Sequence, residues 1–97
     1  MIEEYLKTHE AFGESDAVKA AEIREGLHIK PRDLFHIIEN ERIHGALILS
    51  TKRNGGGYFL PSCEADLKLC TGRLLREAET TARVAHAMLS AWEDMTQ

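Results

Sequence analysis

The spacing of apolar residues predicts two short helices at the start of the chain. Ile2, Leu6 and Phe12 recur at intervals that suit one face of an amphipathic helix. Turn and capping residues at 13–16 interrupt this pattern, and residues 17–18 fit either a brief strand or the beginning of the next helix. Apolar residues between positions 20 and 27 return at helical spacing and predict a second helix that ends near residue 26 or 27.

A third helix is predicted to begin at Pro31. Proline is favoured at the first helical position because its missing N–H would have no partner there. Leu34, Ile37 and Ile38 then form a buried stripe, and Gly45 marks the end of the helix. Residues 27–30 would join the second and third helices in a helix-turn-helix arrangement, with His28 in a turn that requires positive φ.

The pattern changes from helical to extended after Gly45. Residues 46–50 and 57–60 are rich in types that favour strands, and a polar, glycine-containing segment separates them. Asn54 and Gly55 suit a two-residue type I′ turn, while a longer, flexible tip that uses the three glycines at 55–57 is equally compatible. In both cases Lys52 and Arg53 lie at the tip of a hairpin.

A helix of about 30 residues is predicted over residues 64–95, where Gly72 is the only glycine and proline is absent. Pro61 ends the preceding strand, and Ser62 can cap the helix. Apolar and small residues alternate at intervals of four and three, as in a heptad repeat: Leu67, Thr71, Leu74, Ala78, Thr81, Ala85, Met88, Trp92 and Met95. Such a helix is about 45 Å long. The preceding residues cannot cover it, so a second copy of the chain is the simplest partner; whether the helix bends at Gly72 stays open.

The length of 97 residues allows one small domain with an appended element. The composition, 43% hydrophobic and 29% charged, is that of a globular protein. The first ten residues lack an apolar run, and the longest apolar stretch covers only residues 46–49, so we expect neither a secretion signal nor a membrane span. We expect a cytoplasmic protein in which Cys63 and Cys70 are reduced thiols, since two helical turns separate them.

The formal net charge of −4 is unevenly distributed. Acidic residues are in excess before residue 19 and after residue 53, whereas basic residues are in excess between them. This middle segment also holds His28, His36 and His44. His36 and His44 lie more than two helical turns apart, too far to share one metal ion, so we expect no metal site and no cofactor.

The order of the predicted elements resembles the winged helix-turn-helix superfamily over roughly residues 1–61. Residues 45–50 (GALILS) and 57–61 (GYFLP) are similar to the wing of small phage and prophage proteins, in which a charged C-terminal helix follows. Residues 29–34 are placed like the start of their recognition helix. Glu41 departs from the family pattern, which has an inward leucine there: either the third helix ends early or Ile43 supplies the missing contact.

The resemblance implies a mainly α-helical fold with a β-hairpin wing. It divides the chain into a winged helix-turn-helix domain over residues 1–61 and a C-terminal helix over residues 62–97 that could form a coiled coil. It also implies that the third helix enters a DNA major groove and that the wing contacts phosphates or the minor groove. The candidate DNA-binding residues are Lys30, Arg32, His36, Asn40, Lys52 and Arg53.

We therefore expect a sequence-preferring double-stranded DNA-binding protein, either a phage-like transcriptional regulator or an accessory of replication initiation. The competing hypothesis is a protein-interaction adaptor built on a winged helix without DNA binding, which the net negative charge favours. Both hypotheses accommodate a homodimer through Leu67, Leu74, Ala78, Ala85, Met88 and Trp92 of the C-terminal helix. No catalytic motif occurs, so we expect neither an enzyme nor a small-molecule substrate.

Overall fold

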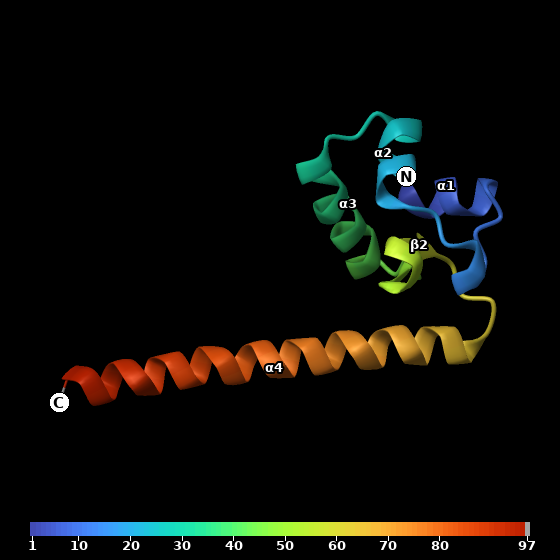
Figure 1. Cartoon of the computed structure of the whole chain (residues 1–97). Helices are drawn as coiled ribbons and strands as arrows, with labels where there is room; N and C mark the ends of the chain where they lie inside the picture. Colours follow the sequence, from blue (N-terminus) through green and yellow to red (C-terminus); the bar gives the residue numbers. More distant parts are fainter. Residues whose placement is uncertain (97) are drawn as a thin grey trace.

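The computed structural model describes residues 1–96 and is mainly helical, with one hairpin (Figure 1). The helices are α1 (Ile2–Thr8), α2 (Ala20–Leu27), α3 (Pro31–Ile43) and α4 (Glu64–Thr96), and the strands are β1 (Leu49–Thr51) and β2 (Gly57–Phe59). Two 3-10 turns, η1 (Glu14–Asp16) and η2 (Arg53–Gly55), complete the order. The prediction of a mainly α-helical chain with a hairpin and a long C-terminal helix is confirmed. Within residues 1–96, no helix combines the length and the apolar character needed to cross a membrane.

α1 is shorter than the predicted first helix. Its side chains Ile2 and Leu6 are fully buried, as their spacing predicts. The helix ends at Thr8, and Glu10 takes a φ of 51°, which lies outside the right-handed helical region. The carbonyl of Ala11 then accepts a hydrogen bond from the N–H of Leu60, and Phe12 forms a bridge with Leu60. The assignment of Phe12 to the first helix is therefore wrong, because this segment pairs with the end of the hairpin.

Val18 belongs to an extended segment and not to α2. Its N–H donates to the carbonyl of Tyr58 and its carbonyl accepts from the N–H of Tyr58, both at 2.8 Å. These bonds form an isolated antiparallel bridge to β2. β2 therefore has hydrogen-bonding partners on both edges, with β1 on one side and the 11–18 segment on the other.

α2 and α3 are joined by three residues, as the sequence predicts. His28 caps the end of α2 in a left-handed conformation, with φ 55° and ψ 48°, and Pro31 opens α3. Ile23 of α2 packs with Leu34 and Ile38 of α3 in a core that also includes α1. The spacing of apolar residues therefore predicts correctly which face of each helix is buried.

Both alternatives for Glu41 are wrong. α3 continues to Ile43, and Ile43 is 78% exposed, so it replaces no inward contact. Instead, the Glu41 carboxylate accepts hydrogen bonds from the N–H groups of Ile2 at 2.8 Å and Glu3 at 3.1 Å. These N–H groups have no partner inside α1, so Glu41 ties α3 to the start of α1. Burial raises the pKa of Glu41, but these bonds and the nearby amino group of Met1 outweigh it, so the pKa is lowered.

The hairpin is shorter and its loop longer than a two-residue turn allows. β1 and β2 pair antiparallel, with Thr51 opposite Gly57 at the end of the ladder. The loop therefore covers residues 52–56, and its φ values are positive at Asn54, Gly55 and Gly56. The two-residue turn is therefore wrong, and the loop is longer, although Gly57 belongs to β2 and only two of the three glycines lie in the tip. Residues 46–48 precede the strand, since the N–H of Ala46 still bonds to the carbonyl of Glu41 at the end of α3.

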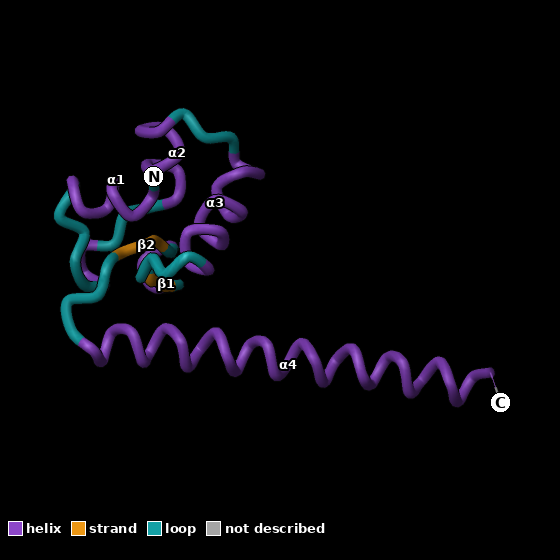
Figure 2. The backbone as a smooth tube through the Cα atoms, turned by 180° about the vertical axis from the view of Figure 1, so that it is seen from behind, coloured by secondary structure: helices purple, strands orange, loops and turns teal. Residues whose placement is uncertain are grey.

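The hairpin lies between the first three helices and α4 (Figure 2). Ile48, which precedes β1, packs with the helical core. Leu49 and Phe59, which face each other across the strands, pack with Leu67 and Cys70 of α4. Since successive residues of an extended chain point to opposite sides, the hairpin links both layers.

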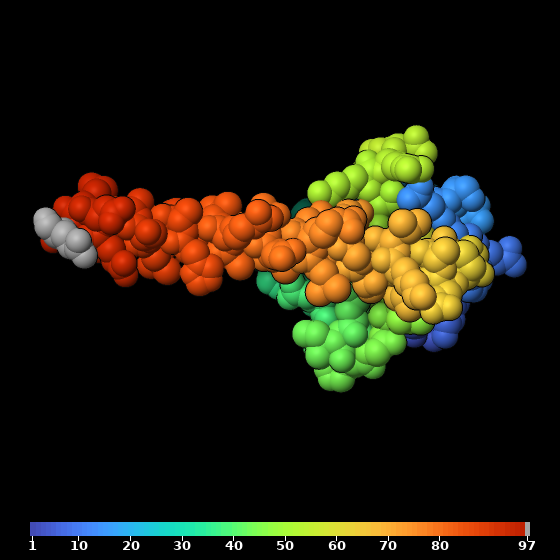
Figure 3. Space-filling model, turned by 90° about the horizontal axis from the view of Figure 1, so that it is seen from below, coloured from blue at the N-terminus to red at the C-terminus, as the bar shows by residue number. Residues whose placement is uncertain are grey.

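α4 is one helix of 33 residues that continues through Gly72 without a break (Figure 1). Near the start of α4, the Asp66 carboxylate accepts hydrogen bonds from the N–H of Ser62 at 2.8 Å and from its hydroxyl at 2.7 Å. The Ser62 hydroxyl therefore donates to a side chain and does not accept from a helical N–H, as the predicted cap would. From Leu74 to Thr96 every residue is exposed. The second half of α4 projects away from the other elements, as Figure 3 shows. We call residues 1–61 the helical body and residues 78–96 the projecting segment.

Candidate functional site

α3 exposes the residues that the sequence predicts to contact DNA. Arg32, His36 and Asn40 are spaced four residues apart and are all exposed. At about 100° per residue they form one stripe about 80° wide, on the side opposite the buried Leu34. Lys30 is exposed just before the first turn of the same helix. The structure therefore places Arg32, His36 and Asn40 on one outer surface of α3, with Lys30 exposed just before the helix begins.

Lys52 and Arg53 are exposed at the hairpin tip, but both have ion-pair partners. Lys52 Nζ lies 3.1 Å from Glu77 Oε1 of α4, and Arg53 Nη1 lies 3.4 Å from Glu14 Oε1 of η1. The N–H of Arg53 also donates to Thr51 Oγ1 at 3.1 Å. Carboxylates of α4 and η1 therefore contact the tip from two sides. Ion pairs as exposed as these are weak, so a competing anion could replace the carboxylates.

α3 and the hairpin tip border a common groove of about 350 Å³. Phe35 and Arg42 line this groove from α3, residues 55–58 line it from the hairpin, and Leu74 lines it from α4. The two elements predicted to contact DNA are therefore neighbours. Phe35, which is 57% exposed, is not among the residues predicted to form the site. Its position about 100° from Leu34 around the helix was the available signal, since it places Phe35 outside the buried stripe.

Two arginines meet at Ser50 and connect α3, the hairpin and α4. Arg42 donates through Nε to the carbonyl of Ile48 at 2.7 Å and through Nη2 to Ser50 Oγ at 3.4 Å. Arg73 of α4 donates to the same hydroxyl oxygen at 2.8 Å. Sequence spacing did not reveal this cluster, because its members come from three separate elements.

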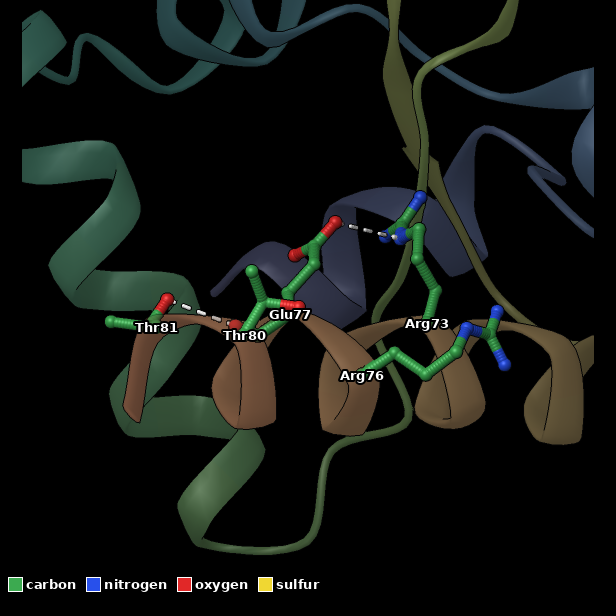
Figure 4. A pocket seen from close by; sticks show the side chains of 5 residues that line it. All are labelled: Arg73, Arg76, Glu77, Thr80 and Thr81. Carbon is green, nitrogen blue, oxygen red and sulfur yellow. Dashed lines mark hydrogen bonds and ion pairs between the residues drawn. The ribbon is translucent and has the colours of Figure 1, made fainter. Parts of the chain in front are cut away.

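Glu77 balances the positive charge beside this cluster. Its carboxylate lies 3.7 Å from Arg73 Nε and 3.1 Å from Lys52 Nζ. Figure 4 shows Arg73 and Glu77 reaching toward each other from α4, while Arg76 extends along the helix. The hydrogen bond from Lys52 lowers the pKa of Glu77, and the charges of Lys52, Arg73 and Arg76 act in the same direction. Glu77 is therefore ionised near neutral pH and neutralises cations at the hairpin tip.

The residues predicted to form a dimer contact divide into two groups. Leu67 packs against the chain's own hairpin, and Leu74 lies in the wall of the groove next to it. The remaining four, Ala78, Ala85, Met88 and Trp92, are exposed on the projecting segment. The dimer contact stays a prediction, and Leu67 already has a partner within the chain.

Metal-ligating side chains do not gather anywhere in residues 1–96: no group of three or more His, Cys, Asp or Glu residues there could hold an ion. Cys63 is exposed, Cys70 is buried, and both are free thiols. No family model matches the sequence, and no curated protein or solved structure matches it either. The winged-helix assignment therefore stays a prediction, and a function has to be proposed from the residues of this chain.

Proposed function

We propose that this chain is a winged helix-turn-helix protein that binds double-stranded DNA with sequence preference and self-associates through α4. The observation that carries the proposal is the exposed stripe of Arg32, His36 and Asn40 on α3, a helix whose Phe35 and Arg42 share a groove with the hairpin. The tip of that hairpin carries two exposed cations. A helix with an exposed polar face fits the major groove. Arginine suits guanine O6 and N7, and asparagine suits adenine N6 and N7, because each offers two correctly spaced groups.

The hairpin would contribute affinity rather than sequence preference. On binding, Lys52 and Arg53 would exchange the carboxylates of Glu77 and Glu14 for DNA phosphates. Phosphate contacts release counterions, so affinity should fall as the salt concentration rises. The resemblance of the hairpin to the wing of phage and prophage proteins supports a role in transcriptional regulation or in replication initiation.

Selection from a random duplex pool, followed by fluorescence anisotropy over a salt series, tests the proposal. If Arg32 contacts a base, Arg32→Ala should weaken binding to the selected site by about 1–3 kcal/mol. Arg83→Ala is the matched control, because it removes the same charge from the projecting segment and should leave the affinity nearly unchanged. Absence of binding to any duplex at low salt would contradict the proposal.

The second candidate function is a protein-interaction adaptor without DNA binding. Its support is the charge balance of the surface: Glu77 and Glu14 pair with the two hairpin cations, and Asp33 is exposed on α3. Retention on heparin separates the two functions when the native chain is compared with the Lys52→Ala/Arg53→Ala double variant. Weaker retention of the double variant favours DNA binding, whereas identical elution favours the adaptor.

A further inference from the structure

The projecting segment of α4 carries a large apolar surface in water. Val84, Met88, Leu89, Trp92 and Met95 are each between 54% and 78% exposed. Side chains of these types together present on the order of 500 Å² of apolar surface. Two such surfaces supply the roughly 1,000 Å² that a specific protein interface requires. Patches of this size on a monomer commonly mark an interaction site.

The chemistry of the projecting segment favours another copy of the same apolar surface as its binding partner. Residues 84–92 contain no Asp, Glu, Lys or Arg, so no Lys or Arg in this stretch attracts nucleic acid. The other side of the segment carries Glu79, Glu93 and Asp94 against a single Arg83. An acidic polar side is unsuited to an anionic membrane surface, which attracts helices rich in Lys and Arg. α4 runs straight past the helical body (Figure 1), and the apolar residues of the patch are exposed.

Side-chain size changes along the patch and distinguishes the two orientations of a pair. We call the heptad positions of this segment the seam. Its first three residues are small and its last three are large: Ala78, Thr81 and Ala85, then Met88, Trp92 and Met95. A parallel pair in register would place Trp92 against Trp92 and Ala78 against Ala78, so the bulky layers would hold the small layers apart and leave voids. An antiparallel pair places a small residue against a large one in every layer: Ala78 with Met95, Thr81 with Trp92, and Ala85 with Met88.

The positions that flank the seam are also uncharged. Ala82 and Leu89 border it on one side, and Val84 and Ala91 border it on the other. Two-stranded coiled coils commonly use charged residues at these flanking positions to select partner and orientation. In this segment the sizes of the seam residues, and not flanking charges, distinguish an antiparallel from a parallel pair of helices.

We propose that residues 78–96 pair antiparallel with the same residues of a second copy, around a twofold axis near residues 85–88. This inference rests on the self-association included in the proposed function, and it adds the contact segment and the orientation. An antiparallel pair holds the two helical bodies at opposite ends of the pair, whereas a parallel pair would hold them side by side.

Sedimentation equilibrium of the full chain tests whether the pair forms. We expect a concentration-dependent dimer. Because Trp92 is the only tryptophan, its fluorescence should shift to shorter wavelength as the dimer forms. Trp92→Ala should weaken the dimer by roughly tenfold or more, whereas Ser90→Ala, on the polar side of the helix, should leave it unchanged. A chain that stays monomeric at high micromolar concentration, or that forms a larger oligomer, would overturn the proposal.

A spin label on the native Cys63 measures the orientation without any substitution. Cys63 is exposed and Cys70 is buried, so the label reacts at the start of α4. In the antiparallel pair the two labels lie about 70 Å apart, and in a parallel pair in register they lie within about 20 Å. A dimer with the short distance overturns the antiparallel arrangement. DNA binding by a monomeric chain refutes this inference alone, and an antiparallel dimer that binds no DNA refutes the DNA-binding function alone.

Discussion

Burial of apolar side chains distinguishes the helical body from the projecting segment of α4. Within residues 1–96, eleven of the twelve buried hydrophobic residues lie in the helical body, and the twelfth, Cys70, lies where α4 contacts the hairpin. An amphipathic pattern therefore builds a core in one region and leaves an open surface in the other. Because burial of apolar surface is the main source of stability, the body is stabilised within the chain, whereas the projecting segment depends on its backbone hydrogen bonds.

Polar side chains show the same contrast. In the helical body, Glu41 bonds to the N–H of Ile2, and Arg42 reaches across to Ser50. In the projecting segment, the hydroxyl groups of Thr81 and Thr96 donate to carbonyls one helical turn earlier. Substitutions in the body should therefore affect folding, whereas substitutions in the projecting segment should affect association.

The largest effect is expected for the core of the helical body. Ile23 is fully buried, so Ile23→Ala should lower the free energy of unfolding by about 2–5 kcal/mol. Val84→Ala removes apolar atoms from the projecting segment and should change the free energy of unfolding by less than about 0.5 kcal/mol when the chain is dilute. Urea denaturation followed by circular dichroism measures both. Equal losses for the two variants would contradict the contrast between the regions.

A smaller effect is expected for the contact between α3 and α1. Glu41→Gln removes charge-assisted hydrogen bonds to Ile2 and Glu3 and should cost about 1–3 kcal/mol of unfolding free energy. Glu39→Gln removes a carboxylate from the exposed surface of the same helix and is the matched control. The same denaturation experiment applies, and a similar cost for both variants would show that the contact to α1 is unimportant.

The pH dependence of this contact has a defined sign. The pKa of Glu41 is lower in the folded chain than in the unfolded one, so Glu41 stabilises the fold above the ordinary pKa of a glutamate, about 4.3. This contribution is lost as the pH falls through the folded-state pKa. The stability difference between the native chain and Glu41→Gln should therefore shrink in acid. A difference that is constant from neutral pH down to the acid transition would show that the carboxylate charge is not involved.

The smallest effect is expected where α4 meets the hairpin tip. Glu77→Gln removes the carboxylate that pairs with Lys52, so it should raise DNA affinity a few-fold at low salt and less at high salt. Glu79→Gln removes the same charge from a neighbouring exposed position on α4. Anisotropy titrations compare the two variants, and equal gains would indicate a general charge effect rather than release of Lys52.

Local patterns predicted most of the fold. Pro31 and Gly45 mark the two ends of α3, and His28 adopts the positive φ that its turn requires. Leu34 and Ile38 are buried because their spacing matches the helical repeat. The error at Phe12 arose because residues far along the chain pair with this segment, and spacing within a short window carries no information on such partners.

The sequence by itself determined the helices, the hairpin and the exposed stripe of α3, because each depends on neighbours within a few residues. Only the tertiary structure decided which carboxylates hold Lys52 and Arg53, what Glu41 contacts, and how far along α4 the helical body extends. These partners are separated by tens of residues, and their meeting depends on how the helices and the hairpin pack. The same packing ends near Glu77 and leaves the rest of an amphipathic helix exposed to solvent.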